Sequence, residues 1–130
     1  MLKKKKEYTS LKKATLFICI IAFFLTETAR NFYRPYIYKK EIFDYYISDT
    51  IGNSLGTVTA VFMILTLVGK GHRQDWKIIV IVILGLIGYE LLNIVSSHPF
   101  DFKDVLATII FGGMSFALYF YLLKAVNKRE

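Results

Sequence analysis

Long runs of residues without any charge constrain this chain more than any other feature. No Asp, Glu, Lys or Arg occurs from Thr50 to Gly69 or from Val105 to Leu123. A helix needs about 20 mostly apolar residues to cross the ~30 Å hydrocarbon core of a bilayer. A mean hydropathy of +0.43 also excludes a disordered chain and disfavours a soluble domain. These features predict an integral membrane protein.

Four membrane-spanning helices are predicted, at about residues 14–29, 50–69, 78–97 and 105–123. The first follows a Lys-rich start, as a cleaved signal peptide also does. However, Glu27 and Arg30 stand where a small-residue cleavage site is needed, so we expect an uncleaved span. The predicted fold is therefore an all-α, polytopic membrane protein, with residues 1–130 forming a single integral membrane domain.

The basic residues divide unequally between the two sides of this bundle. The N-terminal segment, the 70–77 loop and the C-terminal segment hold 12 of the 17 Lys and Arg residues, and the other side holds five. Lys and Arg concentrate on the cytoplasmic side of membrane proteins, so both termini are predicted to be cytoplasmic. We expect a bacterial cytoplasmic membrane. The net charge of +7 then reflects topology and anionic lipids rather than nucleic acid.

Glu90 is the most informative single residue. It lies 12 residues into the third predicted helix, roughly 18 Å from the inner end at ~1.5 Å per residue. A carboxylate at that depth is costly unless it is paired or hydrated, so it is a functional candidate. Asn93 shares its helix face. The alternative is a polar packing pair between Glu90 and either Asn53 or Arg30.

Further polar residues are predicted on the outer side. Asp49 and Asp104 each precede a predicted helix and fit an N-cap, whereas Asp101 lies in a short turn. Small polar residues within the spans, and Gly112 with Gly113, are typical of close helix packing. The complete set of candidate ligand-binding residues is Glu90, Asn93, His98, Asp101, Asp104, Thr108, Glu27, Arg30, Asp49 and Asn53.

The two halves of the chain share a pattern that suggests a tandem two-helix repeat. Each half has a helix ending in an acid, a loop with Pro and Phe-Asp, and a helix opening with Asp. If the repeat is real, the first and third helices run in the same direction and the acids meet on the outer side. The aromatic segment 31–48 is predicted to be an outer loop at the membrane interface, or to line a headgroup pocket.

No sequence motif for catalysis or metal binding occurs. Cys19 is alone within the first span and is expected to be a packing residue, and the two His residues have no Cys partner. We expect no cofactor and no metal. The expected partners are membrane lipids, a second copy of the chain, or a larger membrane complex.

The segment from residue 90 to residue 112 resembles the signature of VanZ-like membrane proteins. That signature is Glu-x-x-Gln, then Arg-x-Phe-Asp-x-x-Asp-x-x-x-Asn, and a Gly one turn later. The matching positions are Glu90, Phe100, Asp101, Asp104 and Gly112. Three positions differ, with Asn93 for the Gln, His98 for the Arg and Thr108 for the Asn. The resemblance implies a small polytopic membrane protein associated with resistance to glycopeptide antibiotics.

Four functions are compatible with these observations. The first is a VanZ-like protein that recognises a lipid, a glycolipid headgroup or an antibiotic at the outer leaflet. The second is a small transporter or ion-coupled subunit in which Glu90 binds a proton or cation. The third is an enzyme acting through paired carboxylates, and the fourth is a structural subunit of a larger complex.

Overall fold

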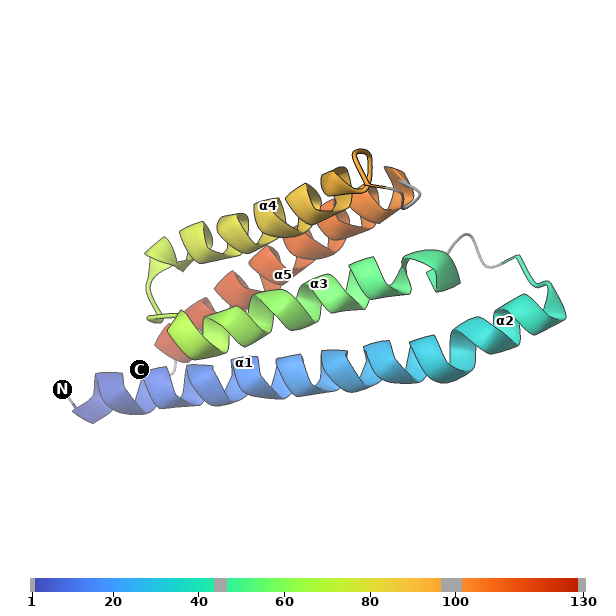
Figure 1. The fold of residues 1–130 in the computed structure, drawn as a ribbon. Coiled ribbons are helices and arrows are strands. Elements are labelled where there is room, and N and C mark those ends of the chain that lie inside the picture. The colour runs from blue at the N-terminus through green and yellow to red at the C-terminus, as the bar shows by residue number, and fades with distance from the viewer. Residues whose placement is uncertain (1, 44–46, 97–101, 129–130) are drawn as a thin grey trace.

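The computed structural model describes residues 2–43, 47–96 and 102–128 (Figure 1). The elements in chain order are α1 (Leu2–Thr28), a π-helical segment η1 (Ala29–Tyr33), α2 (Arg34–Lys40), α3 (Ile47–Val68), a 3-10 turn η2 (Arg73–Asp75), α4 (Trp76–Leu92) and α5 (Phe102–Lys128). No strand occurs within these described ranges, which confirms the predicted all-α class.

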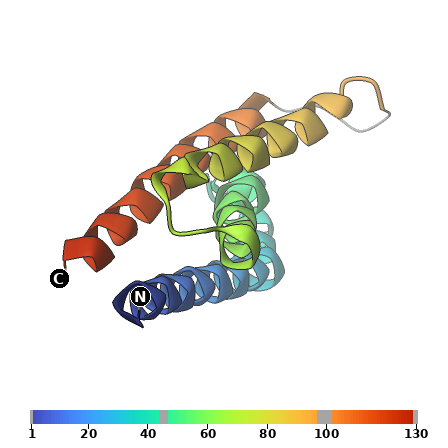
Figure 2. The ribbon, with the colours of Figure 1, turned by 90° about the vertical axis from the view of Figure 1, so that its left-hand side faces the viewer.

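Helix α3 lies at the centre of the bundle and contacts α1, α4 and α5. Figure 2 shows α1 on one side of α3 and the α4–α5 pair on the other. The four long helices alternate in direction, so the N-terminus, the α3–α4 connection and the end of α5 lie together (Figure 1). We call this the terminal end and the opposite one the distal end. Helices α1 and α4 run in the same direction, which the predicted repeat requires but which any up-and-down bundle shares.

In the part of the chain that the structure describes, three helical segments are long and apolar enough to cross a membrane: Tyr8–Lys40, Thr50–Val68 and Phe102–Val126. Only 28% to 33% of the most apolar stretch of each is buried inside the bundle, so most of this apolar surface faces outward. Water would make such a surface unfavourable, whereas lipid chains solvate it. The structure therefore supports a membrane protein with at least these three spans.

The first helical rod is longer than the sequence predicts. Its helix starts at Leu2 instead of residue 14, and the expected loop from Asn31 is helical as far as Lys40. Pro35 has no N–H, so the regular ladder cannot pass through it. The chain adopts a π turn there, and the Arg34 N–H donates to the Ala29 carbonyl. The rod ends at Glu41, which has a left-handed φ of 53°. This conformation allows the Ile42 N–H to donate a hydrogen bond to the Ile37 carbonyl.

The apolar core occupies the terminal half of the bundle. It consists of Leu11, Cys19, Val61, Phe62, Leu65, Ile79, Tyr119 and Leu123. Cys19 is buried there, as expected for a packing residue. The distal half has fewer buried apolar side chains, and this is the half that holds the candidate polar residues.

Helices α4 and α5 are in close contact at Gly112. A Cβ atom built at Gly112 would lie only 2.7 Å from Cδ1 and 2.8 Å from Cγ1 of Ile83, so this position has no room for a side chain. The adjacent Gly113 has no atom within 4 Å of such a Cβ. Gly112 therefore allows the Ile83 side chain to pack directly against the backbone of α5, as small residues do in membrane helix pairs.

We predict that Gly112→Val destabilises the protein by about 1–3 kcal/mol, the usual cost of overpacking. Gly113→Val is the matched control because it makes the same change of helix propensity in open space. Thermal unfolding followed by circular dichroism in detergent measures both. Equal unfolding temperatures for the two variants would show that the Ile83 contact does not limit the helix spacing.

Candidate functional site

Glu90 lies near the distal end of α4 and is only 8% exposed. The Asn93 amide, one turn further on, donates a hydrogen bond from Nδ2 to Glu90 Oε2 over 3.2 Å. Asp104, at the start of α5, carries a second carboxylate close enough to Glu90 for the two charges to interact. The three residues form what we call the distal cluster, which contains two acids and one amide.

The Gly112 contact accounts for this juxtaposition. Ile83 and Glu90 are seven residues apart on α4 and therefore share a face of the helix. Gly112 and Asp104 are eight residues apart on α5, about the same distance towards the distal end. Because the two helices are antiparallel, contact between Ile83 and Gly112 brings Glu90 level with the start of α5. The distal cluster thus depends on a glycine two turns away.

The alternative hypothesis paired Glu90 with Arg30 or Asn53, whereas in the structure Glu90 accepts a hydrogen bond from Asn93. Arg30 forms an ion pair with Glu27, with 3.6 Å between Nη1 and Oε1, and both side chains are partly exposed. A Cβ at Gly52 would lie 3.4 Å from Arg30 Nη2, so the guanidinium lies against the first part of α3 beside Asn53. The candidates that the structure describes thus form two groups at the distal end, one on α1, η1 and α3 and the other on α4 and α5.

The small polar residues between these groups are satisfied within their own helices. Thr108 is buried and donates to the Asp104 carbonyl over 3.0 Å, and buried Ser54 donates to the Thr50 carbonyl over 2.9 Å. The Thr57 hydroxyl donates to the Asn53 carbonyl in the same way. These bonds fit the packing role expected for such residues, and they leave only the oxygen lone pairs of Thr108 for a ligand.

The predicted N-caps are wrong. Helix α3 begins at Ile47 and α5 at Phe102, so Asp49 and Asp104 both lie inside a first helical turn. The Asp104 carboxylate still interacts favourably with the positive end of the α5 dipole. His98 and Asp101 lie outside the described residues, as does the side chain of Asp49.

A second polar cluster, which the sequence analysis did not identify, lies at the terminal end. Asp75 is 3% exposed. Its Oδ1 accepts a hydrogen bond from the Lys70 N–H over 3.2 Å, and its Oδ2 accepts one from the Gly71 N–H over 2.9 Å. The hydroxyl of the fully buried Tyr119 on α5 donates to the same Oδ2. We call this arrangement the Asp75 clasp, because it ties the α3–α4 connection to α5.

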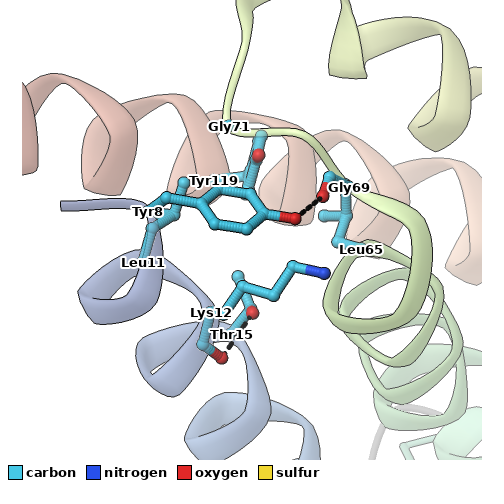
Figure 3. Close-up of a pocket in the computed structure, with 8 residues that line it drawn as sticks. All are labelled: Tyr8, Leu11, Lys12, Thr15, Leu65, Gly69, Gly71 and Tyr119. Atoms are coloured by element: carbon cyan, nitrogen blue, oxygen red, sulfur yellow. Dashed lines mark hydrogen bonds between the residues drawn. The ribbon is translucent and has the colours of Figure 1, made fainter. Parts of the chain in front are cut away.

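Helix α1 joins the same region through Tyr8. Figure 3 shows the Tyr8 hydroxyl donating to the Gly69 carbonyl, over 2.9 Å. Gly71 has a φ of +73°, and a Cβ there would lie 3.2 Å from the Tyr8 ring, so both backbone conformation and space require glycine. The space lined by these residues, by Lys12 and by Tyr119 has no room for a water molecule. This region is therefore a packed polar seam and not a ligand pocket.

The sequence carried only a weak signal for the clasp. Asp75 directly precedes α4, which suggests an N-cap, but its side chain makes no capping bond and turns back to the preceding connection instead. Its partner Tyr119 is 44 residues away in the chain. Only the tertiary structure brings the two together.

Comparisons with known proteins find no match for this chain among protein-family models, curated proteins or solved structures. Among the residues that the structure describes, no three His, Cys, Asp or Glu side chains are grouped closely enough to hold a metal ion.

We predict that Tyr119→Phe destabilises the protein by about 1–3 kcal/mol, because a buried carboxylate loses one hydrogen-bond donor. The matched control is Tyr121→Phe, the same change on the same helix at a side chain that is 69% exposed. Circular dichroism gives the global unfolding temperature, and fluorescence of the single Trp76, next to Asp75, reports on the clasp itself. If both variants unfold at the wild-type temperature, the clasp does not stabilise the bundle.

Proposed function

We propose that this chain is a VanZ-like integral membrane protein of the bacterial cytoplasmic membrane, whose distal cluster recognises a polar headgroup at the outer leaflet. The observation that carries the proposal is the burial of Glu90 beside a second acid, Asp104, with Asn93 as a hydrogen-bond donor. The proposal is supported by the position of two acids of the VanZ-like segment, Glu90 on α4 and Asp104 on α5, in the same part of the bundle.

A fourth span is part of this proposal. Helix α4 has 17 residues, about 25 Å at 1.5 Å per residue, and turns continue beyond it to Ser96. Its length approaches the ~30 Å of a hydrocarbon core. With four spans, both termini lie on one side of the membrane, and the excess of Lys and Arg at the terminal end favours the cytoplasm. The distal cluster then faces the outer leaflet.

The chemistry of the distal cluster favours a ligand that donates hydrogen bonds or carries positive charge. Carboxylates only accept hydrogen bonds, so an ammonium group or sugar hydroxyls complement them. Lipid headgroups, glycolipids and glycopeptide antibiotics all offer such groups. A ligand of this kind would also compensate for the proximity of two carboxylates.

The test is native mass spectrometry of the protein purified with its own membrane lipids. We expect the double variant Glu90→Gln, Asp104→Asn to lose a bound lipid or glycolipid at least tenfold, since each charge-assisted hydrogen bond contributes about 1.5–3 kcal/mol. Glu41→Gln, which removes an exposed carboxylate outside the distal cluster, is the control. Identical bound lipids in all three proteins, with equal unfolding temperatures, would contradict the proposal.

One observation favours an ion-coupled subunit as the second candidate. Asp104, Thr108, Ser115 and Tyr119 follow one face of α5 at spacings of four, seven and four residues. The last three are almost completely buried, and Tyr119 contacts Asp75. Polar residues thus occur along one face of α5 between the distal cluster and the Asp75 clasp. The apolar core of the same bundle counts against this candidate, because Val61 and Phe62 on α3 are fully buried there.

Proton flux into proteoliposomes with an entrapped pH dye separates the two candidates. An ion-coupled subunit gives a flux that Glu90→Gln abolishes and Glu41→Gln does not. The headgroup-binding protein gives the background flux of empty liposomes in all three cases, which is the result we expect.

A further inference from the structure

The terminal part of α1 carries a basic face with no role in the distal cluster. Its residues Lys5, Lys6, Thr9, Ser10 and Lys13 are all exposed and line an open hollow. Lys6, Ser10 and Lys13 are spaced by four and three residues, so they form one row along the helix. This row combines two ammonium groups with a hydroxyl between them.

The basic face points away from the rest of the bundle. Tyr8, Leu11 and Thr15 form the opposite face of α1: Leu11 and Thr15 are buried, and Tyr8 bonds to the α3–α4 connection. Lys12 belongs to that inward side as well, since its Nζ lies 5.1 Å from the centre of the Tyr8 ring. Lys6 and Lys13 therefore face away from the bundle, towards the lipid or solvent around the protein.

The same outward side of α1 changes from basic to apolar within about one turn after Lys13. Phe17 follows Lys13 by four residues and is 65% exposed, and Phe24, two turns further, is 62% exposed. Ile20 between them is also exposed. The order along the helix is thus cationic and hydroxylic first, then aromatic and aliphatic. An anionic phospholipid has the complementary order, with its phosphate above its acyl chains.

We propose that this face binds one anionic phospholipid lengthwise. Its phosphate lies between Lys6, Ser10 and Lys13, and its acyl chains lie along Phe17, Ile20 and Phe24. Two ammonium groups and a hydroxyl donor match the charge and acceptors of a phosphodiester. The site is at the opposite end of the bundle from Glu90, so it is independent of the proposed headgroup site.

The experiment uses the full chain in detergent with palmitoyl-oleoyl phosphatidylglycerol or phosphatidylcholine, followed by native mass spectrometry. We expect wild type to retain one phosphatidylglycerol and to prefer it over phosphatidylcholine. Lys6→Gln, Lys13→Gln should weaken retention about 25-fold, since each Lys near an anionic lipid surface contributes roughly fivefold. The control, Lys39→Gln, Lys40→Gln, removes the same charge from exposed positions at the distal end and should bind as wild type does.

Two further measurements make the outcome decisive. Phe17→Ala, Phe24→Ala keeps the charges and should also reduce retention, because the acyl chains lose their contacts, whereas Glu90→Gln should not. Equal losses in the two Lys variants, or phosphatidylglycerol bound without a fixed stoichiometry, would overturn the proposal in favour of general surface charge. Unchanged retention in both Lys variants, with all proteins folded by circular dichroism, would also overturn it.

Discussion

Hydrocarbon offers no hydrogen-bond partner to a polypeptide backbone, and the architecture of this protein depends on that constraint. Each long apolar segment is helical, because a helix satisfies its own N–H and C=O groups. Side-chain hydroxyls obey the same rule: Ser54, Thr108 and Ser115 each donate to a carbonyl one turn earlier on their own helix. With polar groups satisfied inside each helix, the helices pack through shape, and a single glycine at the α4–α5 contact allows Ile83 to pack against the backbone of α5.

The two ends of the bundle are built from different interactions. At the terminal end, the apolar core and the Asp75 clasp join α1, the α3–α4 connection and α5 without room for water. At the distal end, a buried acid, Glu90, lies with its half-buried amide partner Asn93 and a half-buried second acid, Asp104, on the next helix. The tightly packed end holds the helices together, and the more polar end presents the carboxylates that we propose bind a ligand. Our two binding proposals follow this division and place a cationic or hydroxylic headgroup at one end and an anionic lipid at the other.

Sequence reasoning succeeded where the signal was local and failed where it was not. The uncharged runs located the helices at 50–69 and 105–123 to within a few residues of α3 and α5. The segment after Asn31 was predicted to be a loop because it is polar and contains Pro35, yet a single π turn lets the helix continue. Asp49 and Asp104 looked like N-caps because each precedes an apolar run, but both helices begin earlier. Glu90 was recognised because it is a carboxylate within an aliphatic run. Asp75 was not recognised, because its neighbours in the sequence are polar as well.

The sequence by itself determined the class of this protein, since hydropathy and helix length depend only on residues that are close along the chain. It also determined which end of the bundle carries the excess of Lys and Arg. The tertiary structure alone decided which polar residues meet. The partner of Glu90 across the helix interface depends on the α4–α5 register, and that register depends on the space that Gly112 leaves for Ile83. Likewise, Asp75 is a buried structural acid only because the packing of α5 brings Tyr119 to it across 44 residues of chain.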